Sequence, residues 1–121
     1  MAICKKNKLR SPAALLSAVS IVVTLGFHAP ASAADMEVKI DNFTFNPQTM
    51  TIKAGTTITW INEDDIPHTV AATTKAFKSK ALDTDDKFSF TFTTPGSYDY
   101  FCSLHPHMKA SIVVEAATGA N

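Results

Sequence analysis

Residues 88–102 read FSFTFTTPGSYDYFC, and this stretch indicates the fold class. Its first six positions alternate Phe with Ser or Thr, which is the period-two pattern of a β-strand with one buried face. The turn residues Thr94-Pro95-Gly96 follow, and a second strand is expected from Ser97 to Cys102. Short alternating strands separated by such turn residues favour an all-β protein.

The same alternation continues outward from this pair. Further strands are expected over residues 36–41, 50–53, 57–60, 67–73 and 111–115. Trp60 and Tyr100 fall on the expected inward faces, so we interpret both as core residues. No stretch has sustained helical periodicity, and we interpret residues 74–86, with their Lys and Asp side chains, as a solvated loop. We predict an all-β Greek-key sandwich or barrel of about seven or eight strands.

The first 34 residues have the features of a secretory signal peptide. A basic start at residues 5–10 precedes an apolar segment over 13–27, and small residues at 29–34 allow cleavage after Ala33 or Ala34. A transmembrane anchor is the rival interpretation, but the apolar segment is shorter than the roughly 20 residues that a bilayer requires. We therefore predict a cleaved leader over 1–34, a mature domain over 35–121, and a periplasmic protein without stable membrane insertion.

Cleavage changes the charge and the cysteine count. The domain after residue 34 keeps seven Lys and eleven Asp or Glu residues, which gives a formal net charge of −4. A mildly acidic domain is a poor candidate for nucleic-acid binding, which requires a basic face. Cys4 leaves with the leader, so Cys102 has no second thiol with which to form a disulfide.

Cys102, His105 and Met108 are the candidate metal ligands, in the short loop that follows the strand expected from Ser97 to Cys102. Each residue alone is more typical of a structural role, such as a buried thiol or a core methionine. Their spacing of three residues, directly after a strand, indicates instead that three side chains point to one place. Thiolate and thioether donors suit Cu(I), imidazole also suits Cu(II), and two His with one Cys and a weak axial Met are typical of electron-transfer copper.

A second histidine must complete such a set. His107 lies between two other candidates in a tight loop and would have to share their direction. His68 is the better candidate, because Pro67 restricts the backbone just before it at the start of an expected strand. Structural zinc usually requires several paired Cys and His residues, which this chain lacks.

Residues 55–64, Pro67-His68 and 98–108 together resemble the small blue-copper proteins, or cupredoxins, and the Cys-x-x-His-x-x-Met spacing is similar to that of amicyanin. The resemblance implies one copper ion that cycles between Cu(I) and Cu(II). It implies that His68, Cys102 and His105 are the equatorial ligands and that Met108 is the axial ligand. It further implies a monomeric electron carrier that is not an enzyme.

The partners implied by the resemblance are redox proteins, namely a dehydrogenase donor and a c-type cytochrome acceptor as for amicyanins. Docking would use an apolar patch around Pro106 and Leu104, and protonation of His105 would compete with Cu(I) binding at low pH. A copper-delivery module is the alternative function. A multicopper enzyme would need more histidines than the three that remain after cleavage.

Two positions depart from the amicyanin pattern. Thr69 follows the candidate ligand His68, where amicyanins usually have Asn, and this change affects the hydrogen bonds expected around the thiolate. His107 occupies a position where the family tends to have an apolar residue, and we interpret it as a solvent-facing neighbour of the site.

Overall fold

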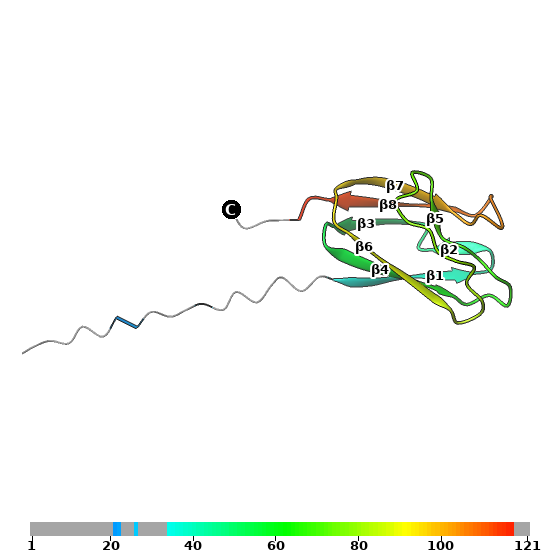
Figure 1. Cartoon of the computed structure of the whole chain (residues 1–121), viewed down its shortest axis with the longest axis horizontal. Coiled ribbons are helices and arrows are strands. Elements are labelled where there is room, and N and C mark those ends of the chain that lie inside the picture. The colour runs from blue at the N-terminus through cyan, green and yellow to red at the C-terminus, as the bar shows by residue number, and fades with distance from the viewer. Residues whose placement is uncertain (1–20, 23–25, 27–33, 118–121) are drawn as a thin grey trace, which may run out of the picture.

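The computed structural model describes residues 21–22, 26 and 34–117 of the chain. Within these residues the chain forms eight β-strands and no helix. The strands make two four-stranded sheets packed face to face (Figure 1). The all-β sandwich prediction is therefore confirmed. Most of the predicted leader lies outside the described residues, so its cleavage stays a prediction. Nothing described has the length and apolarity of a membrane-spanning helix.

Each sheet combines one parallel pair with antiparallel neighbours. The first sheet has the order β2 (Thr44–Asn46), β1 (Asp35–Asp41), β4 (Thr56–Asn62) and β6 (Lys87–Phe92). The second has the order β3 (Thr49–Lys53), β8 (Lys109–Glu115), β7 (Gly96–Phe101) and β5 (Ala71–Ala72). In the first sheet β1 runs parallel to β4, and β2 and β6 are antiparallel edge strands. In the second sheet β8 runs parallel to β3 and antiparallel to β7, which also pairs with β5.

The core lies between the inner faces of the two sheets. Trp60 of β4 is fully buried, and its ring packs against Phe88 of β6 and edge to face against Tyr100 of β7. Strand β4 has buried residues at every second position, as the alternating sequence predicts. Aromatic residues from both sheets thus form a rigid centre beneath the end of the sandwich that carries the candidate ligands.

Two details of the predicted organisation are wrong. The strand expected over residues 67–73 is reduced to β5, with isolated bridges from His68 to Leu82 and from Ala71 to Lys78. Residues 74–86 are also more than a solvated loop, because Phe77 and Leu82 are 4% and 1% exposed. Their apolar side chains enter the core while the Lys and Asp side chains of the segment stay largely outside, an arrangement without the simple alternation of a strand.

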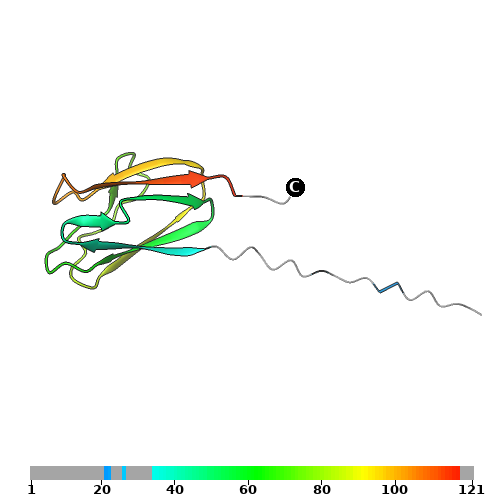
Figure 2. The same cartoon turned by 180° about the vertical axis from the view of Figure 1, so that it is seen from behind.

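The β7–β8 hairpin loop and the β1–β2 turn lie at the same end of the sandwich (Figures 1 and 2). The segment that follows β4 reaches this end as well, since Asp64 accepts hydrogen bonds from the β1–β2 turn. Three segments that are far apart in the sequence therefore meet here and supply the candidate metal centre.

Candidate metal centre

The loop between β7 and β8 places its candidate ligands by two consecutive turns. Phe101 and Lys109 form the last pair of the hairpin, and the Cys102 N–H donates to the Met108 carbonyl at 3.1 Å. Inside this closure, the His105 N–H donates to the Cys102 carbonyl at 3.2 Å. The Met108 N–H donates to the His105 carbonyl at 2.8 Å. Each three-residue step is thus one turn, which explains why the spacing brings the side chains together.

His68 is fixed by its own backbone and by a buried amide. Its N–H donates to the Leu82 carbonyl at 3.1 Å, and the Leu82 N–H returns a bond to the His68 carbonyl at 2.7 Å. The Asn62 side chain is fully buried and donates to the Ile66 and Leu82 carbonyls, each at 2.8 Å. The chain on both sides of His68 is therefore held without regular strand pairing.

Three candidate donor atoms face one another. The Nδ1 atom of His68 lies 3.8 Å from the Cys102 sulfur, and Nδ1 of His105 lies 3.6 Å from the same sulfur. All three atoms lie within 4.8 Å of one another. His68 and Cys102 are fully buried, whereas His105 is half-buried. Met108, on the same loop, is 5% exposed.

This arrangement fits a metal ion. Metal–nitrogen and metal–sulfur bonds of about 2.0 and 2.3 Å, about 120° apart, place the nitrogen about 3.7 Å from the sulfur. The two Nδ1–sulfur distances, 3.8 and 3.6 Å, are close to that value. A soft thiol with two imidazoles suits copper. The other ring nitrogen of His68, Nε2, has a separate partner.

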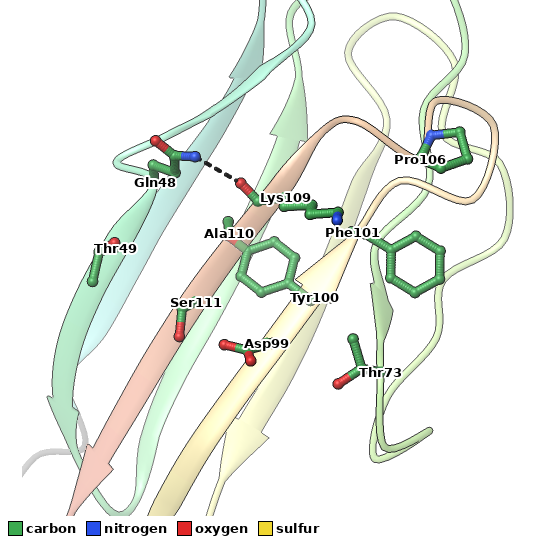
Figure 3. A pocket seen from close by; sticks show the side chains of 10 residues that line it. All are labelled: Gln48, Thr49, Thr73, Asp99, Tyr100, Phe101, Pro106, Lys109, Ala110 and Ser111. Carbon is green, nitrogen blue, oxygen red and sulfur yellow. Dashed lines mark hydrogen bonds between the residues drawn. The ribbon is translucent and has the colours of Figure 1, made fainter.

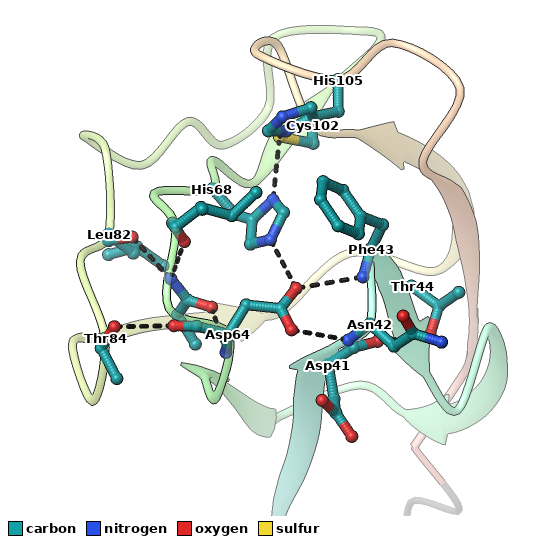
Figure 4. A network of polar contacts seen from close by, with 12 residues as sticks. Asp41, Asn42, Phe43, Thr44, Asp64, His68, Leu82, Thr84, Cys102 and His105 are labelled. Carbon is teal, nitrogen blue, oxygen red and sulfur yellow. Dashed lines mark hydrogen bonds and ion pairs between the residues drawn. The ribbon is translucent and has the colours of Figure 1, made fainter.

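That partner is the Asp64 carboxylate, which lies 2.7 Å from His68 Nε2 (Figure 4). A carboxylate beside Nε2 favours the tautomer that keeps its proton there and leaves Nδ1 free to bind a metal. Burial opposes ionisation of Asp64, but hydrogen bonds from the Phe43 and Asn42 N–H groups and from His68 outweigh it and lower the pKa of this carboxyl group. Asp64 is therefore an anion at neutral pH.

Residues 32–115 match the sequence model of a protein family, the copper binding proteins of the plastocyanin/azurin family. The chain belongs to this family. An amicyanin of Paracoccus versutus is 35% identical over 103 residues, which cover 77% of this chain and 78% of the relative. Amicyanin-alpha of Methylorubrum extorquens is 36% identical over 113 residues, covering 85% and 95%. The solved structure of a reduced amicyanin mutant is 33% identical with a TM-score of 0.64, covering 71% and 86%.

The amicyanin-like resemblance is therefore confirmed, and the cofactor of this cupredoxin is one copper ion. Membership makes the protein a copper-binding electron carrier rather than an enzyme. The match extends through both segments that carry the candidate ligands, since His68 and Met108 both lie within residues 32–115.

Thr69 takes over contacts at the position where amicyanins usually have Asn. Its N–H lies 3.3 Å from the Cys102 sulfur, and its hydroxyl oxygen lies 3.8 Å from that sulfur. The same hydroxyl oxygen accepts the Ser103 N–H at 2.7 Å and lies 2.7 Å from the Ser103 hydroxyl. If the Ser103 hydroxyl donates, the Thr69 hydroxyl proton is free to point at the sulfur. Thr69 thus ties the two ligand segments together in this cupredoxin.

The remaining loop residues face outward. His107 is exposed and is not part of the cluster of donor atoms. Leu104 is 51% exposed, and Pro106 is exposed as well. Among the candidate ligand side chains, only the His105 ring reaches the surface appreciably, and these apolar neighbours flank it.

A groove of about 650 Å³ lies beside the loop (Figure 3). It runs along β7 and β8, where the Gln48 side chain donates to the Lys109 carbonyl at 3.1 Å. Pro106 is its one contribution from the ligand loop, and none of the candidate donor residues lines it. Its lining consists of Gln48, Thr49, Thr73, Asp99, Tyr100, Phe101, Pro106, Lys109, Ala110 and Ser111.

Sequence reasoning missed two residues of the site, Asp64 and Phe43. Asp64 stands four residues before His68, but outside a helix this spacing has no directional meaning. Phe43 lies 25 positions before His68 in a turn between two strands, and no sequence pattern relates the two. Both contacts depend on how β1 and β4 lie in the sheet.

Proposed function

We propose that this cupredoxin is an exported carrier of single electrons in which His68, Cys102, His105 and Met108 hold one copper ion. One observation supports the ligand set most directly: two imidazole Nδ1 atoms face one buried thiol within 4.8 Å. Met108 is proposed as the axial ligand because it is buried on the same loop and hydrogen-bonded through its backbone to Cys102 and His105.

The bound copper ion would supply a one-electron couple between Cu(I) and Cu(II). The contribution of the chain is to keep its donor atoms in place in both oxidation states. Asp64 orients His68, Thr69 restrains Cys102, and two backbone turns hold His105 and Met108. Because these restraints do not depend on the metal, little of the site has to rearrange when an electron arrives or leaves.

Partners are proposed to approach at His105. Its ring is half-buried, and the exposed Leu104 and Pro106 make the surrounding surface partly apolar. A small apolar contact suits brief encounters between redox proteins. We propose a monomer that takes electrons from a dehydrogenase and passes them to a c-type cytochrome, as the resemblance to amicyanins implies.

A visible spectrum of the Cu(II)-loaded domain tests this function. The wild type is expected to show an intense thiolate-to-Cu(II) band, which is absent from Cys102→Ser. In the wild type, this band should be lost on reduction and regained on reoxidation over repeated cycles. A colourless wild type would contradict the proposal. Rapid loss of copper to a modest chelator, without reversible redox cycling, would favour copper delivery instead.

Export is tested separately by the mass of the protein recovered from a periplasmic fraction. Cleavage after Ala33 or Ala34 should leave a domain that begins at Ala34 or Asp35. Recovery of the uncleaved chain from the cytoplasm would overturn the proposed localisation and leave the proposed copper chemistry untouched.

A further inference from the structure

Phe43, in the turn between β1 and β2, is an exposed aromatic residue that touches both proposed histidine ligands. Its side chain is 50% exposed. The ring stands edge to face against His68, at a centroid distance of 5.6 Å, and against His105, at 5.2 Å. The two imidazoles are themselves 5.0 Å apart. The phenyl ring therefore spans the gap between the two ligands (Figure 4).

The backbone at this turn is unfavourable for Phe43. Asp41 and Thr44 pair across the turn, and the two residues between them, Asn42 and Phe43, have φ angles of 49° and 59°. Two-residue turns with positive φ at both positions favour Asn followed by Gly. Glycine would be the relaxed choice at position 43, because a bulky side chain with positive φ is strained.

A single carboxylate stabilises this strained turn and one ligand together. The Asn42 N–H donates to Asp64 Oδ1 at 2.7 Å, and the Phe43 N–H donates to Oδ2 at 3.0 Å. The same Oδ2 atom lies 2.7 Å from His68 Nε2. Asp64 therefore clamps the backbone of Phe43 and the ring of His68 to a common point. Strain that the surrounding structure maintains is a reason to look for a role of the strained side chain.

We propose that Phe43 is a positioning residue of the copper site, which braces the imidazoles of His68 and His105 and covers the gap between them so that copper is retained. This proposal rests on the proposed ligand set. The phenyl ring supplies no donor atom and acts only through the two imidazoles. Its removal should let the half-buried His105 move more freely and let water or a chelator reach the metal from this side.

The variant Phe43→Gly separates this role from ordinary folding. Glycine removes the ring and also relieves the left-handed strain, so the apoprotein should unfold in urea at the same concentration as the wild type or at a higher one. Copper transfer to a modest chelator should nevertheless become about tenfold faster or more, because two edge-to-face contacts with the ligands are lost. The visible band of the Cu(II) form should broaden or shift as the ligands gain freedom.

Asn42→Gly is the matched control. It introduces glycine at the neighbouring left-handed position of the same turn, keeps the backbone N–H and leaves the phenyl ring in place. Copper release from this variant should equal that of the wild type. Phe43→Leu, which keeps an apolar cover without the aromatic edge, should release copper at an intermediate rate and keeps the test valid if the glycine variant folds poorly.

The outcomes distinguish this proposal from the proposed function. If the wild type is blue but Phe43→Gly and Phe43→Leu release copper at the wild-type rate with an unchanged spectrum, Phe43 is not a positioning residue and the ligand set stands. Equal acceleration in Asn42→Gly would also overturn the role of the ring. A wild type without the thiolate band would instead contradict the ligand set itself.

Discussion

The Thr69 hydroxyl joins the two segments that carry the candidate ligands of this cupredoxin. It accepts the Ser103 N–H and lies within reach of the Cys102 sulfur. The Thr69 N–H, at 3.3 Å from the sulfur, provides a second and independent contact. The side chain and the backbone of this residue can therefore be separated by mutation.

Thr69→Val removes the hydroxyl and keeps the shape and the N–H contact. The Ser103 N–H loses its acceptor, so we expect the free energy of unfolding of the apoprotein to fall by about 1–2 kcal/mol. Less hydrogen bonding to the sulfur leaves more charge on it, so the reduction potential should also fall. Voltammetry and urea unfolding measure the two effects. Ser103→Ala keeps the backbone hydrogen bond to Thr69 and should change the free energy of unfolding and the reduction potential less. If Thr69→Val leaves both quantities at the wild-type values, the role assigned to Thr69 is wrong.

Tyr100 makes a different prediction, which concerns high pH. Burial raises the pKa of its hydroxyl group to about 12. In the unfolded chain the same group ionises near pH 10, so the unfolded state releases its proton first as the pH rises. Stability from this group is complete below pH 10 and is lost as the pH rises through 10 to 12, by roughly 2–3 kcal/mol. Measured by urea unfolding between pH 8 and 12, the free energy of unfolding should decline less steeply with pH in Tyr100→Phe than in the wild type. Equal declines in the two proteins would refute the prediction.

Much of the candidate site could be predicted from its residue types and their spacing. The three-residue steps from Cys102 to Met108 predicted that these side chains lie close together, because each step is one backbone turn. The contributions of Asp64 and Phe43 were not visible, since they depend on a turn and a loop brought together by the pairing of β1 with β4. Local patterns predict local turns, whereas contacts between sheet ends require the topology.

At the scale of elements, residues 74–86 show why a charged segment was misinterpreted. Its Lys and Asp side chains are largely exposed as expected, but Phe77 and Leu82 enter the core at irregular intervals. Alternation predicted β1, β3, β4, β6, β7 and β8, because a strand repeats every two residues, whereas the short strand β2 was not predicted. A segment fixed by isolated bridges has no such period, so its burial could not be derived from the pattern.

Leu82→Ala tests whether this segment supports the candidate ligand His68. The leucine is 1% exposed, and its backbone forms two hydrogen bonds with His68. Truncation leaves a cavity in the core and should lower the free energy of unfolding by about 2–5 kcal/mol. Copper binding should also weaken, because the cavity lets the backbone bridge between residue 82 and His68 shift. Lys80→Ala, at an exposed site two residues earlier, should stay within about 0.5 kcal/mol of the wild type. Equal effects of the two substitutions would restore the interpretation of a solvated loop.

For the whole molecule, the predicted mature domain combines a small net negative charge with a proposed contact surface at one end. Its formal charge of −4 favours redox partners with a positive surface. Exposed acidic residues near the ligand end include Asp65, which stands three positions before His68. Glu37, also exposed, lies near the start of β1 and thus towards the opposite end of the strand.

Electron transfer to a positively charged partner should accordingly slow as salt is added, because screening shortens the range of attraction to about 8–10 Å. Two charge reversals locate the surface responsible. Asp65→Lys and Glu37→Lys change the net charge by the same amount, so a purely global attraction predicts equal loss of rate. Docking at the ligand end predicts that Asp65→Lys slows the bimolecular rate severalfold more at low salt, and that the difference vanishes at high salt. Stopped-flow rates across a salt series measure this. A larger effect from Glu37→Lys would place docking at the other end, away from His105.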